Sequence, residues 1–147
     1  MTVFIDADGC PVVKLTVAAA KKYGLVCCIL CDTAHEIRYD GVQTVVVDKG
    51  ADSADFALAA RVQPGDLVIT QDYGLAGMCL ARRARILHQD GWEYTADNID
   101  ALLFARHAAR KVRASGGRLK GPSKRKPEQD RAFAAALDRL LQTCVQG

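Results

Sequence analysis

The chain of 147 residues lacks any long apolar run. Without a stretch of about 18 or more uncharged apolar residues, no segment is expected to span a bilayer. The first eight residues, MTVFIDAD, contain two acids and no basic residue, which is unlike a signal peptide. We therefore expect a soluble protein that stays in the cytoplasm and has no membrane partner.

Cysteine and histidine lack the spacing of a metal site. Cys28 and Cys31 are spaced as in a zinc knuckle, but no second pair follows them. Residues three apart in a strand point to opposite faces, so we expect these thiols to be reduced and buried rather than to share a metal. The three histidines, His35, His88 and His107, are scattered, and we expect them on the surface or in the core.

Acidic residues are absent from the segment 106–126, which carries nine lysines and arginines. The rest of the chain holds 11 basic and 17 acidic side chains. Such an asymmetry fits an enzyme that binds a polyanion near a metal site, and it equally fits a solvated helix face with a basic loop. Arg106, Arg110 and Arg113 have the spacing of one helix face. Only Phe104 is an aromatic neighbour in sequence, so base-specific readout has no support.

Strand-like apolar runs alternate with helical patterns along the chain. This alternation predicts a mostly parallel sheet with helices on both faces, a three-layer α/β/α fold formed by a single domain over 1–147. We predict about five strands in the order 3-2-1-4-5, a basic helix and loop over 97–126, and a C-terminal helix over 127–143. Strands are expected at 2–6, 25–31, 43–47, 66–70 and 84–88, and the other helices at 11–23, 52–62 and 73–82.

Acids follow the ends of these strands. Open parallel sheets bind ligands at the carboxyl ends of their strands, near the point where strand order reverses. Asp6 and Asp8 end the first strand, Asp52 and Asp55 open the helix after the third, and Asp72 follows the fourth. The predicted strand order brings Asp6, Asp8 and Asp72 together. Crowded carboxylates repel one another unless a cation neutralises them, and oxygen ligands without histidine or cysteine favour Mg²⁺ or Mn²⁺.

Each of these acids also has a structural explanation. Asp52 and Asp55 fit the N-cap and N3 positions of a helix, and Asp72 fits the N-cap of the next one. Asp8 fits a turn. Asp6 is the hardest to explain structurally, because an acid at the end of a buried strand needs a partner.

A series of short motifs runs along nearly the whole chain. They are VFIDADGCPV at 3–12, Asp52 with Ala54-Asp55, GDLVITQD at 65–72, Leu75-Ala76, Gly91 with Tyr94-Thr95, Asn98-Ile99, Arg106, RASG at 113–116, Gly121-Pro122, DRAF at 130–133 and Leu137-Asp138. In this order and combination they resemble the uncharacterised bacterial YaiI/YqxD family. That family is considered related to PIN-like nuclease domains, which hold divalent metals with carboxylates at these strand ends.

The resemblance implies a PIN-like domain whose metal-site candidates are Asp6, Asp8, Asp55 and Asp72. One loop departs from the family pattern. This chain has HQDG at 88–91, where the family commonly has an Asn-Pro-Arg-Gly-like loop. Because the basic residue is missing, we expect no phosphate contact from that loop.

The first hypothesis for the function is a metal-dependent phosphodiesterase, a nuclease acting on nucleic acid, with RNA favoured over DNA by the PIN-like resemblance. Asp6 and Asp72 would hold Mg²⁺ or Mn²⁺, with Asp8 and Asp55 completing the site or orienting the water, so all four are catalytic candidates. The basic segment would grip phosphates. Its candidate contacts are Arg106, Arg110, Arg113, Arg118, Lys120, Lys124, Arg125 and Lys126.

Two other hypotheses remain open. The motif Asp6-x-Asp8-Gly9 after an apolar strand resembles the first motif of haloacid-dehalogenase-like phosphatases, in which the first Asp is the nucleophile. That family also needs a lysine and a later acidic pair at the carboxyl end of a strand, whereas Gly65-Asp66 precedes its strand. The third hypothesis is a non-catalytic domain that binds nucleic acid or another partner and carries a vestigial site.

Overall fold

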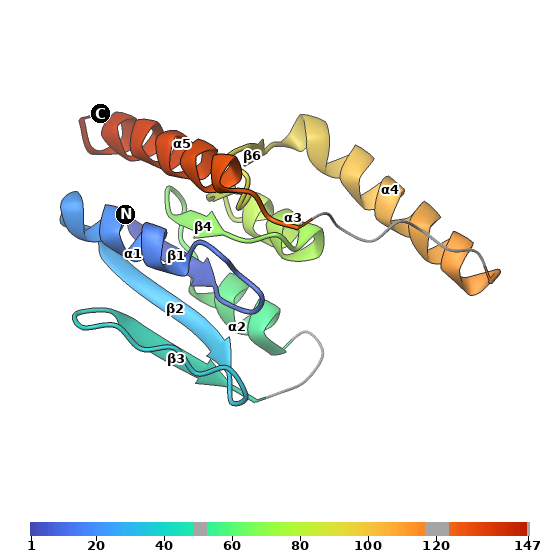
Figure 1. The fold of residues 1–147 in the computed structure, drawn as a ribbon, viewed down its shortest axis with the longest axis horizontal. Coiled ribbons are helices and arrows are strands. Elements are labelled where there is room, and N and C mark those ends of the chain that lie inside the picture. The colour runs from blue at the N-terminus through green and yellow to red at the C-terminus, as the bar shows by residue number, and fades with distance from the viewer. Residues whose placement is uncertain (49–52, 117–123, 147) are drawn as a thin grey trace.

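A six-stranded sheet forms the centre of the molecule. The computed structural model describes residues 1–48, 53–116 and 124–146 (Figure 1). The strand order is β3-β2-β1-β4-β5-β6, in which only β6 is antiparallel to its neighbour. The strands are β1 Thr2–Asp6, β2 Val26–Asp32, β3 Gln43–Val47, β4 Leu67–Ile69, β5 Arg85–Leu87 and β6 Glu93–Tyr94.

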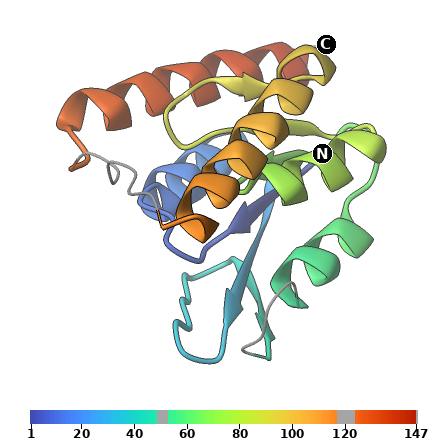
Figure 2. The ribbon, with the colours of Figure 1, turned by 90° about the vertical axis from the view of Figure 1, so that its right-hand side faces the viewer.

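Helices cover both faces of this sheet. The helices are α1 Val13–Lys22, α2 Ser53–Arg61, α3 Tyr73–Ala81, α4 Ala96–Ala114 and α5 Pro127–Gln146. One apolar cluster joins the sheet to α1 and α5, and a second joins its other face to α2 and α3. The helix α4 packs on α3 and then extends beyond the sheet (Figure 1). The helix α5 packs beside α1 on the opposite face of the sheet and runs along the top of the view in Figure 2. The predicted three-layer α/β/α architecture is therefore confirmed.

Alternation along β1 decides which face each side chain meets. Val3 and Ile5 belong to the cluster under α1 and α5, whereas Phe4 belongs to the cluster under α2 and α3. Ile5 is completely buried, and burying a side chain of that size contributes roughly 1.5–3 kcal/mol. Asp6 comes two residues after Phe4, so its side chain lies on the same face as Phe4, toward α2 and α3.

The register of the sheet brings several strand ends to one level. Ile5 of β1 pairs with Ile69 of β4, which pairs with Leu87 of β5. The chain runs outward from β1 through β2 to β3 and then returns to place β4 on the other side of β1. Strand order therefore reverses between β1 and β4, which is where ligands bind in open sheets of this kind.

The structure differs from the sequence prediction at a few element ends. The strand β6 was not predicted, because two residues are too short for a strand pattern to be recognised. Pro11 and Val12 lie in a turn, and α1 begins at Val13 rather than at Pro11. The last helix continues to Gln146, beyond the predicted end at residue 143. Among the described residues, no helix is both long and apolar enough to cross a membrane.

Candidate functional site

A short chain of hydrogen bonds joins the ends of β1 and β4. The Thr70 hydroxyl donates to Oδ2 of Asp6 at 2.8 Å, and the backbone N–H of Asp72 donates to the Thr70 hydroxyl at 3.0 Å. Asp6 is only 9% exposed and Thr70 only 2% exposed. The partner that the sequence required for a buried Asp6 is therefore a hydroxyl group rather than a lysine or arginine.

Burial and like charge disfavour the ionised form of Asp6. Burial raises the pKa of the Asp6 carboxyl to about 6, the Thr70 hydrogen bond partly opposes this rise, and the charges of Asp72 and Asp8 add to it. Three of the four predicted acids therefore interact electrostatically, as the strand order indicated. A cation beside Asp6 would offset both the burial and the repulsion.

Asp72 has the structural role that the sequence analysis left open. It is the N-cap of α3, where its Oδ1 accepts the backbone N–H groups of Gly74 at 2.8 Å and Leu75 at 3.2 Å. Capping holds the carboxylate at the positive end of a helix. The cap therefore fixes the position of an acid beside Asp6, and capping and function are compatible.

Asp8 lies in the turn that leaves β1. The N–H of Cys10 donates to the Ala7 carbonyl at 3.1 Å, and Gly9 adopts a left-handed φ of 65° within this turn. A Cβ atom on Gly9 would lie 3.3 Å from Nε2 of Gln71, so glycine also allows the close approach of the β4 end. Asp8 itself is exposed to solvent, in reach of a ligand.

A compact group of ligand atoms surrounds Asp8. Asp8, Asp32 and His35 each offer an atom within 4.8 Å of the other two, and theirs is the only such group of three found in the described ranges. Asp6, Asp8 and Asp72 do not approach one another as closely. The sequence analysis missed Asp32 and His35. Asp32 ends β2 as Asp6 ends β1, so applying the strand-end rule to every strand would have found it.

Asp55 lies in the first turn of α2, at partial exposure. Burial raises the pKa of the Cys79 thiol to about 12, and the charges of Asp55 and Asp6 both add to this rise. Asp55 and Asp6 therefore approach Cys79 of α3 from two elements. Asp52, the other acid expected at this helix, lies outside the described residues.

The predicted nucleic-acid contacts divide into four sets, of which Arg125 alone is the last. Arg110 and Arg113 are exposed on α4, the helix to which Arg106 also belongs. Lys124 and Lys126 are exposed just before α5. Arg118 and Lys120 lie outside the described residues.

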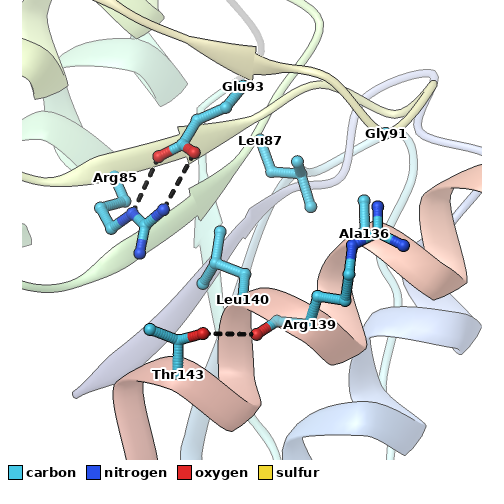
Figure 3. A pocket seen from close by; sticks show the side chains of 8 residues that line it. All are labelled: Arg85, Leu87, Gly91, Glu93, Ala136, Arg139, Leu140 and Thr143. Atoms are coloured by element: carbon cyan, nitrogen blue, oxygen red, sulfur yellow. Dashed lines mark hydrogen bonds and ion pairs between the residues drawn. The ribbon is translucent and has the colours of Figure 1, made fainter. Parts of the chain in front are cut away.

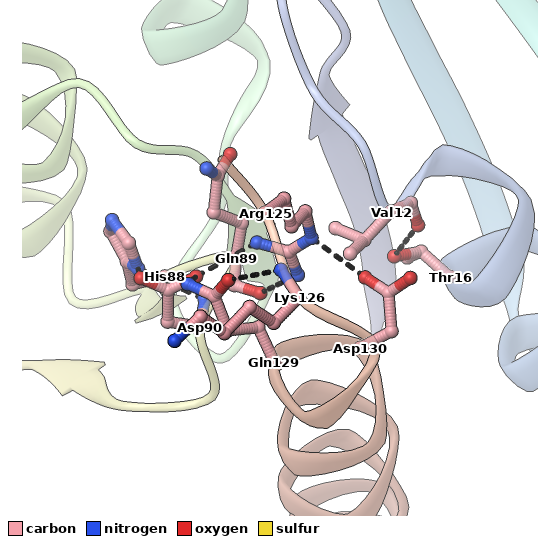
Figure 4. A network of polar contacts seen from close by, with 9 residues as sticks. All are labelled: Val12, Thr16, His88, Gln89, Asp90, Arg125, Lys126, Gln129 and Asp130. Atoms are coloured by element: carbon pink, nitrogen blue, oxygen red, sulfur yellow. Dashed lines mark hydrogen bonds and ion pairs between the residues drawn. The ribbon is translucent and has the colours of Figure 1, made fainter. Parts of the chain in front are cut away.

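Arg125 differs from the other predicted contacts, because its guanidinium is engaged within the protein. It donates to Asp130 at 2.7 Å, to Asp90 at 2.8 Å and to the Gln89 carbonyl at 2.8 Å. Figure 4 shows the side chain between the β5–β6 loop and the first turn of α5. Arg125 therefore joins the basic segment to the edge of the sheet.

A cavity of about 280 Å³ lies away from Asp6, Asp8 and Asp72. Its walls come from β5, β6 and α5, and the Arg85–Glu93 ion pair stands at one end (Figure 3). Leu87 and Leu140 form part of its wall and belong to the cluster under α1 and α5. Because Asp6 faces α2 and α3, the sheet separates this cavity from the acidic site.

Two fully buried polar side-chain atoms in the described part of the chain have no hydrogen-bond partner, the Tyr94 hydroxyl and Oε1 of Gln89. Burial raises the pKa of Tyr94, and the charges of Tyr73, Asp72, Asp6 and Asp90 add to the rise in that order. The orphaned hydroxyl therefore lies within the electrostatic reach of the acidic site.

Asp66 does not meet the requirement of the phosphatase hypothesis. That hypothesis needs an acidic pair at the carboxyl end of a strand. The Asp66 carboxylate accepts the N–H of Thr2 at 2.9 Å and the N–H of Gln63 at 2.9 Å. These contacts lie at the amino end of β1 and β4, opposite to Asp6. Asp66 therefore anchors the start of the sheet.

Comparison with known proteins gives one consistent result. The family model described as "Uncharacterized BCR, YaiI/YqxD family" matches residues 4–143. A "UPF0178 protein" of Exiguobacterium sibiricum is 45% identical over 141 residues, covering 96% of each chain. Another, of Ruminiclostridium cellulolyticum, is 48% identical over 138 residues, covering 93% of this chain and 90% of its own. No solved structure matches.

Proposed function

The chain belongs to the YaiI/YqxD family, and for this member we propose a divalent-metal-dependent phosphodiesterase that cleaves nucleic acid, with RNA as the substrate. The single observation that carries the proposal is the state of Asp6. A buried carboxylate whose pKa is raised to about 6, with two further carboxylates adding to the rise, is an electrostatic cost without a structural return. Such a cost is typical of a functional site.

The residue types around Asp6 suit a hard divalent cation. The charges of Asp72 and Asp8 act on Asp6, and the ligand atoms of Asp8, Asp32 and His35 lie within 4.8 Å of one another. Mg²⁺ and Mn²⁺ prefer carboxylate oxygens and retain bound water. When bound, such a cation polarises a phosphate group and lowers the pKa of bound water.

The protein's own side chains position the site. The Thr70 hydroxyl orients Asp6, and the N–H of Asp72 orients the Thr70 hydroxyl. Asp72 is itself held by the first turn of α3. The charged groups are therefore arranged before substrate arrives, which is how electrostatic stabilisation becomes effective.

The basic segment supports a polyanionic substrate. Arg110, Lys111 and Arg113 are exposed on α4, and no acid lies between residues 106 and 126. Phosphate contacts from such residues supply affinity without reading sequence. The combination of a carboxylate site with the exposed basic residues of α4 favours nucleic acid over a small phosphomonoester as the substrate.

Cleavage of single-stranded RNA tests the proposal. The purified protein is expected to cut the RNA with Mg²⁺ or Mn²⁺ and to stop when a chelator is added. Asp6→Asn, which keeps an oxygen for Thr70 but removes the charge, is expected to abolish cutting. Asp40→Asn, at an exposed acid in the β2–β3 connection, is the matched control and is expected to cut like wild type. Cutting in excess chelator, or undiminished cutting by Asp6→Asn, would refute the metal role.

A further inference from the structure

His88 directly follows β5, at the level of the sheet where β1 ends at Asp6. Phe4 pairs with Val68, and Val68 pairs with Ile86. Two residues further along the chain come Asp6, the last residue of β1, Thr70, which directly follows β4, and His88, which directly follows β5. Continued alternation places the three in one row on the face toward α2 and α3. Two strand spacings, about 10 Å, separate the backbones of Asp6 and His88.

Contacts hold the imidazole of His88 in one tautomer and one orientation. The N–H of Asp90 donates to Nδ1 at 3.0 Å, so Nδ1 carries a lone pair and the proton is on Nε2 (Figure 4). The ring stacks on Trp92 with centroids 4.3 Å apart and planes 13° apart. It meets Tyr94 edge-on at 6.0 Å. Burial lowers the pKa of His88, the Asp90 charge opposes this, and the Arg125 charge adds to it.

The remaining nitrogen of this ring is available to a ligand. Nε2 donates no hydrogen bond within the described residues. It is also not one of the fully buried side-chain atoms there that lack a hydrogen-bond partner. The His88 side chain is 11% exposed, so a small part of the ring reaches the surface. Asp90, whose carboxylate lies 3.7 Å from Nδ1, is engaged by Arg125. A fixed N–H donor with no partner among the described residues therefore lies at the level of the sheet where β1 ends at Asp6.

Building on the proposed function, we infer that the Nε2–H of His88 contacts a phosphate oxygen of the nucleic-acid strand bound at Asp6. The sequence analysis expected no phosphate contact from this loop because a basic residue is missing. A neutral imidazole supplies the donor without a positive charge. Trp92 and the Asp90 N–H are positioning groups, because they fix the ring rather than touch the phosphate.

Two substitutions separate this role from a structural one. His88→Asn keeps an acceptor for the Asp90 N–H near the place of Nδ1 but has nothing at Nε2. His88→Gln reaches the place of Nε2 with an amide N–H but loses the acceptor near Nδ1. Substrate contact predicts damage from Asn and rescue by Gln, whereas loop anchoring predicts the reverse.

The measurement is the affinity for a fluorescein-labelled oligouridylate by fluorescence anisotropy in chelator. Every variant is combined with Asp6→Asn, so that the RNA remains intact, and thermal melting verifies that each variant is folded. His88→Asn is expected to weaken binding about tenfold relative to the Asp6→Asn parent, since one hydrogen bond to a charged group is lost. His88→Gln is expected to recover most of that loss.

The outcomes also separate this inference from the proposed function. Unchanged binding by His88→Asn, or a larger loss with His88→Gln than with His88→Asn, overturns the phosphate contact while leaving metal-dependent cleavage by wild type intact. Absence of RNA binding by the Asp6→Asn parent, together with absence of cleavage by wild type, overturns both. Loss with Asn and recovery with Gln supports the contact.

Discussion

Asp6 is a single residue whose place in the candidate site lowers the stability of the folded protein. Its carboxyl is buried at the end of β1 and is stabilised mainly by the Thr70 hydroxyl. The pKa near 6 exceeds the unfolded value of 3.8, so the folded state binds a proton more readily than the unfolded chain does. Folding therefore disfavours the charge that a metal would need.

The first prediction concerns the pH dependence of stability in chelator. Well below pH 3.8 Asp6 is protonated in both states and adds no penalty to folding. The penalty grows as pH rises until it is complete above about pH 6. Asp6→Asn is expected to remove this penalty, so the variant gains on the order of 3 kcal/mol over wild type at pH 8 and little at pH 3.5. Urea unfolding of both proteins at the two pH values measures the difference. An equal difference at both values contradicts the account.

The sequence did not predict the positions of three residues near the candidate site, namely Thr70, Asp32 and His88. The sequence analysis identified acids at strand ends, because topology places the ends of parallel strands together. It did not find that Thr70 bonds Asp6, because that contact depends on the register of β1 against β4. Asp32 directly follows the strand predicted at 25–31 but was not considered, because only the acids after the first, third and fourth strands were examined. His88 was interpreted as a surface or core histidine, because histidines were examined only for metal-ligand spacing.

The helix α3 shows how one element serves both fold and site. Its N-cap, Asp72, is also one of the carboxylates near Asp6. Strands and helices of this kind were predictable because apolar runs and helical periodicity continue over many residues. The strand β6 was not, since its two residues are defined by pairing with β5 rather than by a pattern.

Substitution of Asp72 is expected to separate capping from charge. Asp72→Ala removes the acceptor for two backbone N–H groups and is expected to cost about 1 kcal/mol of unfolding free energy. Asp72→Asn retains an acceptor oxygen and is expected to lose less stability, while RNA cleavage falls as far as with Asp72→Ala. Urea unfolding and the cleavage assay provide the two readouts. Full cleavage by Asp72→Asn would mean that this carboxylate only caps.

The β5–β6 loop depends on its close approach to α5. A Cβ atom on Gly91, whose φ is 93°, would lie 2.8 Å from the Ala132 carbonyl oxygen. Gly91→Ala is expected to lower the free energy of unfolding by about 1 kcal/mol or more, in addition to the cost of placing alanine at a positive φ. Gly41→Ala is the control, since Gly41 also has a positive φ of 74° but nothing within 4 Å of its Cβ position. Equal losses of thermal stability for both variants would refute the predicted clash.

Charge at the scale of the whole molecule is separated in space as well as in sequence. Carboxylates gather where the carboxyl ends of β1, β2 and β4 meet, while α4 carries exposed arginines outward from α3 (Figure 1). The Arg125 contacts join the end of the basic segment to the β5–β6 loop. A polyanion held by α4 would therefore lie beside the acids rather than across the sheet from them.

Salt dependence of RNA binding tests this arrangement. Binding through phosphates weakens with salt at a slope of about −0.7 per phosphate neutralised on single strands. The double variant Arg110→Ala, Arg113→Ala removes two phosphate contacts and is expected to reduce the slope by about 1.4 in magnitude. Lys14→Ala with Lys21→Ala, at two exposed lysines of α1 on the other face of the sheet, is the matched control and is expected to leave the slope unchanged. Identical slopes for both double variants would exclude α4 as the binding surface.

The central claim is that the site at Asp6 binds a divalent cation. Calorimetric titration with Mn²⁺ tests this claim most directly, because it measures cation binding without requiring a known substrate. Wild type is expected to give saturable binding, Asp6→Asn is expected to give none, and Asp40→Asn is expected to match wild type. Both replacements remove one negative charge, so a loss confined to Asp6→Asn identifies the site rather than the net charge. Superimposable isotherms for wild type and Asp6→Asn would contradict the account.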